Sequence, residues 1–81
     1  MDNVISLTAV PINTAVFIFD IKKSPCRDRL YELGFTQGTR VVPLHISPGR
    51  SATAYFVKGA VIALRNSDAK NIYVNAEDSL S

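Results

Sequence analysis

Residues 39–64 read TRVVPLHISPGRSATAYFVKGAVIAL, and this stretch decides the fold. Three apolar runs within it have the length and the valine, isoleucine and aromatic content of short strands: 39–46, 53–58 and 60–64. Turn-forming residues divide these runs, because Pro48 and Gly49 fit the centre of a type II turn and Gly59 ends the second run. The stretch therefore predicts three consecutive strands joined by tight turns.

Pro43 lies inside the first of these runs. Proline has no amide hydrogen to donate to a neighbouring strand, so we expect an edge strand, a bulge or a sharp bend at this residue. In the run 53–58, Tyr55 alternates in phase with Val57, and we expect its ring to face the core.

A further strand is predicted upstream, at residues 15–21, where aromatic and β-branched residues are again concentrated. By strict alternation, one face of this strand holds Phe17, Phe19 and Ile21.

Residues 24–34 predict one α-helix. Ser24 is a good N-cap, Pro25 suits the first helical position, and Gly34 suits a left-handed exit. Phe35 then follows at the position where an apolar residue folds back onto the last helical turn. A narrow apolar stripe along this helix is formed by Cys26, Leu30 and Leu33.

Shorter elements complete the chain. We expect a helical turn over residues 6–10 with Ser6 as its N-cap, a polar helical turn at 65–69 and a last strand at 72–74. About five short strands in so small a chain favour closure, which hides strand edges. The predicted fold class is all-β: a small SH3-like β-barrel with one α-helix inserted between the first two strands. An OB barrel is the less favoured alternative, because its helix normally comes later in the chain.

The length and composition limit the possible functions. The 81 residues suit a single domain, 1–81, with residues 76–81 expected to fray, and the net charge is only +2. Only one cysteine, Cys26, and one histidine, His45, are present, too few for a disulfide or a structural zinc site. We expect Cys26 to be a packing residue, His45 to be a surface residue, and the protein to need no metal or other cofactor. No targeting segment or membrane-spanning run is visible, which predicts a cytoplasmic protein.

Catalytic equipment is missing from the sequence. It contains no Ser/His/Asp array, phosphate-binding loop or Cys-x-x-Cys motif, so we expect no enzymatic activity. The basic residues are dispersed among carboxylates, which argues against a nucleic-acid partner.

Several segments, in order and with matching spacing, resemble the ferrous iron transport protein A (FeoA) family. Residues 29–38, RLYELGFTQG, are similar to the family pattern R-L-x-x-L-G-(L/M/F)-x-P-G. Residues 55–65, YFVKGAVIALR, and residues 68–74, DAKNIYV, resemble two further family segments. The chain departs from the family at Asn13, where a glycine is usual, and at residues 48–51, so that loop presents a different surface from that of its relatives.

This resemblance implies an SH3-like protein that works beside FeoB, the membrane ferrous-iron transporter with a cytosolic GTPase domain. It implies a cytoplasmic accessory role without enzymatic activity. From the residues we expect no nucleic-acid partner and no direct insertion into the membrane, and we favour a monomer. One alternative is a regulatory SH3-like module of a metal-dependent transcriptional repressor system, and a less favoured one is a small barrel that binds nucleic acid.

We expect docking through the helix 24–34 and the loop 47–52, which we take to be neighbours. We expect Leu30 and Leu33 first of all to pack the helix against the barrel. The functional alternative is that the helix lies over one end of the barrel and leaves a cleft that Leu30 lines, and that Tyr73 faces outward to line a partner groove. The residues expected to bind the partner are Arg27, Arg29, Leu30, Glu32, Arg50 and Tyr73.

Overall fold

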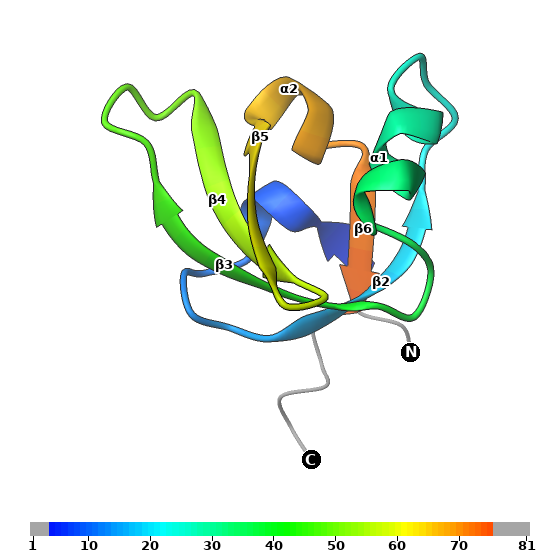
Figure 1. Cartoon of the computed structure of the whole chain (residues 1–81), viewed down its shortest axis with the longest axis horizontal. Coiled ribbons are helices and arrows are strands. Elements are labelled where there is room, and N and C mark those ends of the chain that lie inside the picture. The colour runs from blue at the N-terminus through cyan, green and yellow to red at the C-terminus, as the bar shows by residue number, and fades with distance from the viewer. Residues whose placement is uncertain (1–3, 76–81) are drawn as a thin grey trace.

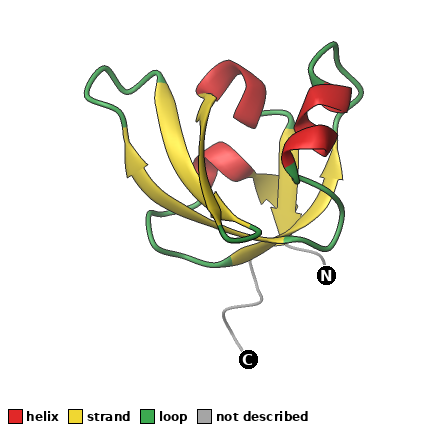
Figure 2. Ribbon diagram, viewed as in Figure 1, coloured by secondary structure: helices red, strands yellow, loops and turns green. Residues whose placement is uncertain are grey.

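A computed structural model describes residues 4–75 of the chain. Within this range the chain forms six strands, one 3₁₀ helix and two short α-helices (Figures 1 and 2). In chain order the elements are β1 (Val4–Ser6), η1 (Leu7–Ala9), β2 (Val16–Ile21), α1 (Arg27–Leu33), β3 (Arg40–Ile46), β4 (Ala52–Val57), β5 (Ala60–Arg65), α2 (Asn66–Ala69) and β6 (Ile72–Asn75).

The strands form one antiparallel sheet in the order β1-β6-β2-β3-β4-β5. The sheet is strongly curved, and its strands rise on both sides of the molecule with α2 between them (Figure 1). The expectation of a mostly β protein is therefore confirmed.

Strand β1 was not expected from the sequence. Its three residues pair with β6, from Val4 opposite Asn75 to Ser6 opposite Tyr73. Three residues are too few to show a recognisable alternation. Because β1 precedes β2, the described chain has six strands, not five, and α1 lies between the second and third of them.

Strand β2 corrects a prediction about which residues share a face. The pairing of β2 with β6 shifts between Ile18 and Asp20, which marks a β-bulge. An extra residue reverses the alternation beyond it, so Ile21 is buried at 2% exposure while Phe17 and Phe19 remain exposed. The grouping of Ile21 with the two phenylalanines was wrong for this reason.

The start of helix α1 also differs from the prediction. The helix begins at Arg27 with Cys26 at the N-cap, and no side chain caps it. The Arg27 amide donates to the Ser24 carbonyl oxygen at 3.1 Å, so residues 24–27 form a turn before the helix. The Ser24 hydroxyl lies 3.4 Å from the Cys26 sulfur and does not cap the helix.

The end of α1 confirms the prediction. Gly34 has a φ of 108°, and the Phe35 amide donates to the Leu30 carbonyl oxygen at 3.0 Å. Leu30 and Phe35 both have 0% exposure, and the Phe35 ring meets the Tyr55 ring edge-on at 6.3 Å between centroids. Tyr55 itself is 1% exposed, as its alternation predicted.

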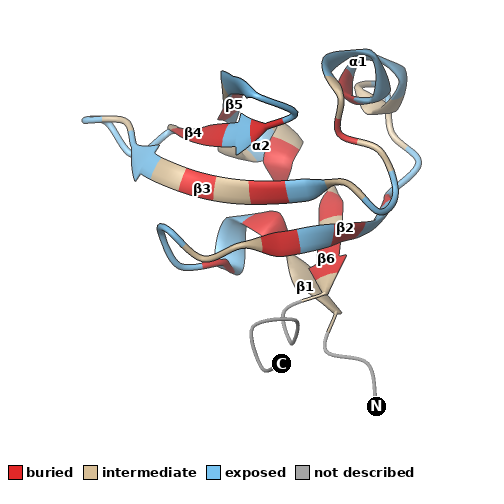
Figure 3. Cartoon of the chain, turned by 60° about the horizontal axis from the view of Figure 1, so that its bottom comes forward, coloured by how far each residue is buried: buried red, intermediate tan, exposed pale blue. Residues whose placement is uncertain are grey.

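The buried residues form one core cluster. Figure 3 marks them in red along the strands and helices. Every strand except the short β1 contributes buried apolar side chains to it, as do η1 and α1. Of the predicted stripe on α1, Leu30 is fully buried, Cys26 is half-buried, and Leu33 is exposed.

The smaller elements test several local predictions. The 3₁₀ helix η1 is capped by the Ser6 side chain, as predicted. The register of β3 against β4 shifts between Pro43 and His45, which confirms the bulge expected at the proline. Asn13 adopts a positive φ of 68°, a conformation that asparagine tolerates better than most residues.

The two tight turns differ in backbone geometry. Gly49 has no positive φ, and instead Arg50 has a φ of 62°, so the predicted type II turn at Pro48 and Gly49 was wrong. Lys58 and Gly59 have φ values of 50° and 81°, and the pairing residues on either side are Val57 and Ala60. This is the geometry of a two-residue type I′ hairpin turn.

Replacing Gly34 with alanine is expected to destabilise the fold by about 1–2 kcal/mol, because a side chain is strained at this positive φ. Gly49→Ala is the matched control, since Gly49 has no positive φ and no atom lies within 4 Å of the position of a new Cβ. We expect the control to change stability by less than about 0.5 kcal/mol. Urea unfolding of both variants measures the difference, and equal effects would contradict the account of the helix exit.

Because Tyr55 is buried, we expect the stability of the fold to depend on pH in the alkaline range. Burial raises the pKa of its phenol above the ordinary value of 10.0. Above pH 10 the unfolded state therefore holds fewer protons than the folded state, and the free energy of unfolding falls as pH rises. We expect the wild type to lose stability relative to Tyr55→Phe as the pH rises above 10, measured by urea unfolding. Parallel pH profiles for the two proteins would contradict this.

Candidate functional site

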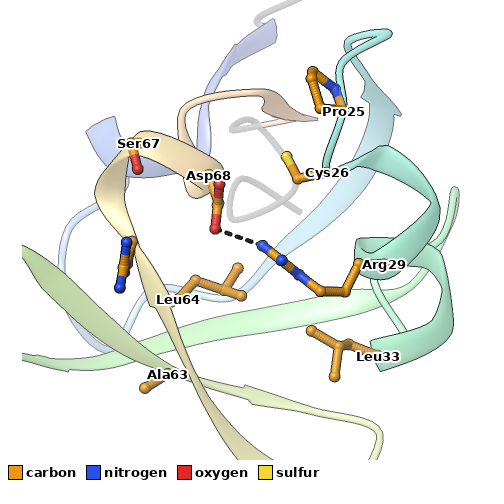
Figure 4. Close-up of a pocket in the computed structure, with 9 residues that line it drawn as sticks. Pro25, Cys26, Arg29, Leu33, Ala63, Leu64, Ser67 and Asp68 are labelled. Carbon is orange, nitrogen blue, oxygen red and sulfur yellow. Dashed lines mark hydrogen bonds and ion pairs between the residues drawn. The ribbon is translucent and has the colours of Figure 1, made fainter.

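A cleft of about 640 Å³ lies between helix α1 on one side and strand β5 with helix α2 on the other (Figure 4). Nine residues line it: Pro25, Cys26, Arg29, Leu33, Ala63, Leu64, Arg65, Ser67 and Asp68. The lining residues of the two walls are at least 30 residues apart in the sequence.

One wall follows from the helical repeat of α1. Cys26, Arg29 and Leu33 are three and four residues apart, and this spacing places them on one face of the helix. Leu33 is 38% exposed and presents its side chain to the cleft. This wall is therefore apolar at the end of α1 and carries a positive charge at its middle.

The opposite wall combines the end of β5 with the start of α2. Ala63 and Arg65 are exposed, whereas Leu64 between them is buried and belongs to the core. The chain turns directly from Arg65 into α2, which places Ser67 and Asp68 at the rim.

An ion pair links the two walls. An Arg29 Nη donates a hydrogen bond to an Asp68 carboxylate oxygen at 2.9 Å (Figure 4). The Arg29 side chain is 61% exposed and that of Asp68 is 23% exposed, so the pair contributes little to stability. Its effect is to fix the direction of the Arg29 guanidinium across the cleft.

Cys26 does not form part of a metal site in this geometry. Its sulfur lies 3.4 Å from the Ser24 hydroxyl oxygen and 3.7 Å from the Asn71 side-chain nitrogen. Across residues 4–75, no three His, Cys, Asp or Glu side chains are grouped closely enough to hold a metal ion. The half-buried side chain of Cys26 packs against the core, as the sequence predicted.

Comparison with known proteins identifies the family of this chain. The family model of the FeoA domain matches residues 5–76. The chain belongs to the FeoA family.

Solved structures agree with this assignment. The FeoA-like protein from Clostridium acetobutylicum is 28% identical, with a TM-score of 0.87 over 94% of this chain and 90% of that one. Stenotrophomonas maltophilia FeoA, solved with zinc, is 27% identical, with a TM-score of 0.78 over 89% of this chain and 91% of that one. That relative is described as a prokaryotic SH3 domain protein, with a suggested role as a ferrous iron transport activating factor.

A more distant likeness concerns the fold alone. A manganese-dependent transcriptional repressor is 14% identical, with a TM-score of 0.84 over 94% of this chain and 43% of that one. No curated protein matches the sequence of this FeoA family member.

The structure separates the residues that were expected to bind the partner. Arg29 lines the cleft, whereas Leu30 has 0% exposure and lies beneath it. The prediction that Leu30 lines the cleft was wrong, and Leu33 has that position instead. Leu30 belongs instead to the buried core, together with Phe35, which is the packing role first expected for it.

Arg27 and Glu32 lie on α1 but do not line the cleft. The Arg27 Nε donates a hydrogen bond to the Tyr31 hydroxyl oxygen at 2.8 Å, and its guanidinium carbon lies 5.4 Å from the Tyr31 ring centre. This hydrogen bond raises the pKa of the Arg27 guanidinium. Arg27 is therefore bound to its own helix on a face other than that of Arg29.

Arg29 lines the cleft, whereas Arg50 and Tyr73 do not. Figure 1 shows the loop between β3 and β4, which carries Arg50, on the opposite side of the molecule from α1. The expectation that loop 47–52 is a neighbour of the helix was wrong. Tyr73 is half-buried on β6, where it pairs with Ser6 and Asp20.

Sequence reasoning missed the β5 and α2 wall of the cleft. Ala63, Arg65 and Asp68 belong to the two segments that resemble the FeoA family, and that resemblance was the signal that could have marked them. His45 is exposed, as expected. Among the described residues, no helix has the length and apolar character needed to cross a membrane.

Proposed function

We propose that this FeoA family member is a non-enzymatic accessory protein of ferrous iron uptake that binds the cytosolic part of a FeoB-type membrane transporter. The match of the FeoA domain to residues 5–76 carries the proposal, since it covers almost the whole chain. The role suggested for the Stenotrophomonas maltophilia relative, activation of ferrous iron transport, is of the same kind. Binding to a cytosolic domain also requires a cytoplasmic location for this protein.

The proposed scaffold is an SH3-like barrel. The strongly curved six-stranded sheet supports this interpretation, as does the SH3 domain description of the relative from Stenotrophomonas maltophilia. A small β scaffold of this kind binds partners through the loops and helices at its rim. Here α1 and α2 are those elements, and the cleft lies between them.

The mechanism we propose is a shift of a conformational equilibrium in the transporter. A bound protein changes such an equilibrium only when it binds one conformation more tightly than the other. The contact is made by the cleft face of α1, with Arg29 as the exposed charge and Leu33 as the exposed apolar residue. Docking there needs no bond chemistry from this protein.

The repressor-module alternative has weaker support. The likeness to the manganese-dependent repressor, at 14% identity, shows a common fold and gives no information on function. Nucleic-acid binding is not favoured either, because the cations do not form one basic patch: Arg29 lies on α1, and Arg50 lies on the β3–β4 loop on the opposite side of the molecule.

Charge reversal on α1 tests the proposal. Arg29→Glu places a carboxylate beside Asp68 and removes one of the two positive charges of the cleft, so we expect association with a detergent-solubilised FeoB-type transporter to weaken about tenfold. Arg27→Glu makes the same change in charge two residues away, on a face outside the cleft, and is the matched control.

Affinity is measured by immobilising the protein and titrating the transporter, with the melting temperature of each variant as a check on folding. We expect Arg27→Glu to stay within about threefold of the wild type. No association of the wild type with the transporter would refute the proposed function, and equal losses for the two variants would refute the choice of the cleft face.

A further inference from the structure

Strand β5 is an edge of the sheet. It is hydrogen bonded to β4 on one side, and within residues 4–75 no strand pairs with its other side. That second side faces the cleft, since Ala63, Leu64 and Arg65 all line it and α1 forms the opposite wall (Figure 4). The cleft is thus bounded by the free edge of a strand.

The hairpin geometry shows which backbone groups lie on this free edge. In a two-residue hairpin the residues flanking the turn exchange both hydrogen bonds, and bonded and non-bonded pairs then alternate. The Val57 and Ala60 pair is therefore bonded, as are the pairs formed by Ile62 and Leu64 with their partners on β4. The amide groups of the alternate residues point away from β4: Val61, Ala63 and Arg65.

This edge lacks several of the features that usually prevent another strand from pairing. Natural edge strands are commonly short, bulged, or carry proline or lysine. Strand β5 has six residues, its register against β4 is uninterrupted, and its sequence AVIALR has neither proline nor lysine. Val61 is 61% exposed on it. The other edge, β1, is protected by its length of three residues.

The charges around the cleft favour a partner segment that is acidic. Its lining contains two cations, Arg29 and Arg65, and a single anion, Asp68. The one anion of the lining, Asp68, is bonded to Arg29, so the exposed Arg65 has no carboxylate partner within the lining and can take one from a bound segment. Arg65 also ends the free edge, so the charge lies in line with the unpaired amides.

We propose that an extended, acidic segment of the transporter adds to the free edge of β5 as a seventh strand inside the cleft. The backbone of the segment pairs with Val61 and Ala63, and one of its carboxylates contacts Arg65. The inference rests on the proposed function for the identity of the partner. Beyond that function, the inference specifies that the recognised segment is extended and acidic.

The geometry favours a strand over a proline-rich segment. A proline has no amide hydrogen to donate to the outward-facing carbonyl groups of β5, whereas an ordinary extended segment supplies both donors and acceptors along its length. Ala63 also favours the addition of a strand, because its small exposed side chain leaves room for a second backbone beside the edge.

The test uses the wild-type protein and three blocked seven-residue probe peptides: alternating valine and glutamate, alternating valine and lysine, and one rich in proline. Amide hydrogen exchange is followed by NMR in the presence of each peptide. We expect the glutamate peptide to slow exchange about tenfold or more at Val61 and Ala63, with little change at Ile62 and Leu64, which are already bonded to β4.

Equal protection by the lysine peptide would overturn the charge preference. Binding of the proline-rich peptide, without protection by the glutamate peptide, would overturn strand addition. Protection that rises with protein concentration in the absence of peptide would assign the edge to a second copy of this chain and would also overturn the proposal.

A variant pair tests the same point in the complex. Ala63→Pro removes an amide hydrogen that faces the cleft and leaves the bonds to β4, whereas Ala63→Ser keeps the amide and is the matched control. We expect about a tenfold loss of transporter binding for the proline variant alone. The peptide experiment on the wild type decides the matter even where Ala63→Pro fails to fold. Transporter binding without protection of the β5 amides would leave the proposed function standing and refute this inference.

Discussion

At Gly34 the chain leaves helix α1 with a φ of 108°, and the residues on either side of this reversal, Leu30 and Phe35, are completely buried. Burying two such side chains stabilises the fold by about 1.5–3 kcal/mol each. The reversal also brings the Phe35 ring against the Tyr55 ring on β4. These contacts hold the C-terminal end of helix α1 to the sheet. The position of α1 in turn sets one wall of the cleft.

The cleft is a consequence of how little of α1 is buried. Leu30 is the one residue of the helix in the core, and Leu33, one turn along, stays exposed. The helix therefore stands beside β5 without covering its free edge, and the contact across the cleft is the exposed ion pair between Arg29 and Asp68. The position of α1 beside β5 therefore produces both the cleft and the unpaired strand edge.

Local sequence signals predicted much of the fold. Gly34, Phe35 and Tyr55 were placed correctly, because a left-handed exit and strand alternation depend on neighbouring residues alone. The wrong predictions concern features that depend on contacts between distant segments, which local signals do not show. The bulge in β2 depends on its pairing with β6, and the three residues of β1 become a strand only because β6 lies beside them.

The candidate site was less predictable than the fold. Arg29 was found because it is a charged residue on the one predicted helix, but its partner Asp68 is 39 residues away in the sequence. Loop 47–52 was placed beside the helix, and the curvature of the sheet instead carries it to the opposite side of the molecule. The tertiary structure determines which charged residues form pairs, and neighbouring residues in the sequence do not predict these pairs.

The central claim is that this FeoA family member works by presenting the cleft between α1 and β5 to a protein partner. It is tested most directly by following the amide chemical shifts of the protein while the isolated cytosolic GTPase part of a FeoB-type transporter is added. The account predicts that the largest changes map to the α1, β5 and α2 residues that line the cleft. Changes concentrated on the β3–β4 loop or on the outer face around Phe17 and Phe56 would contradict it.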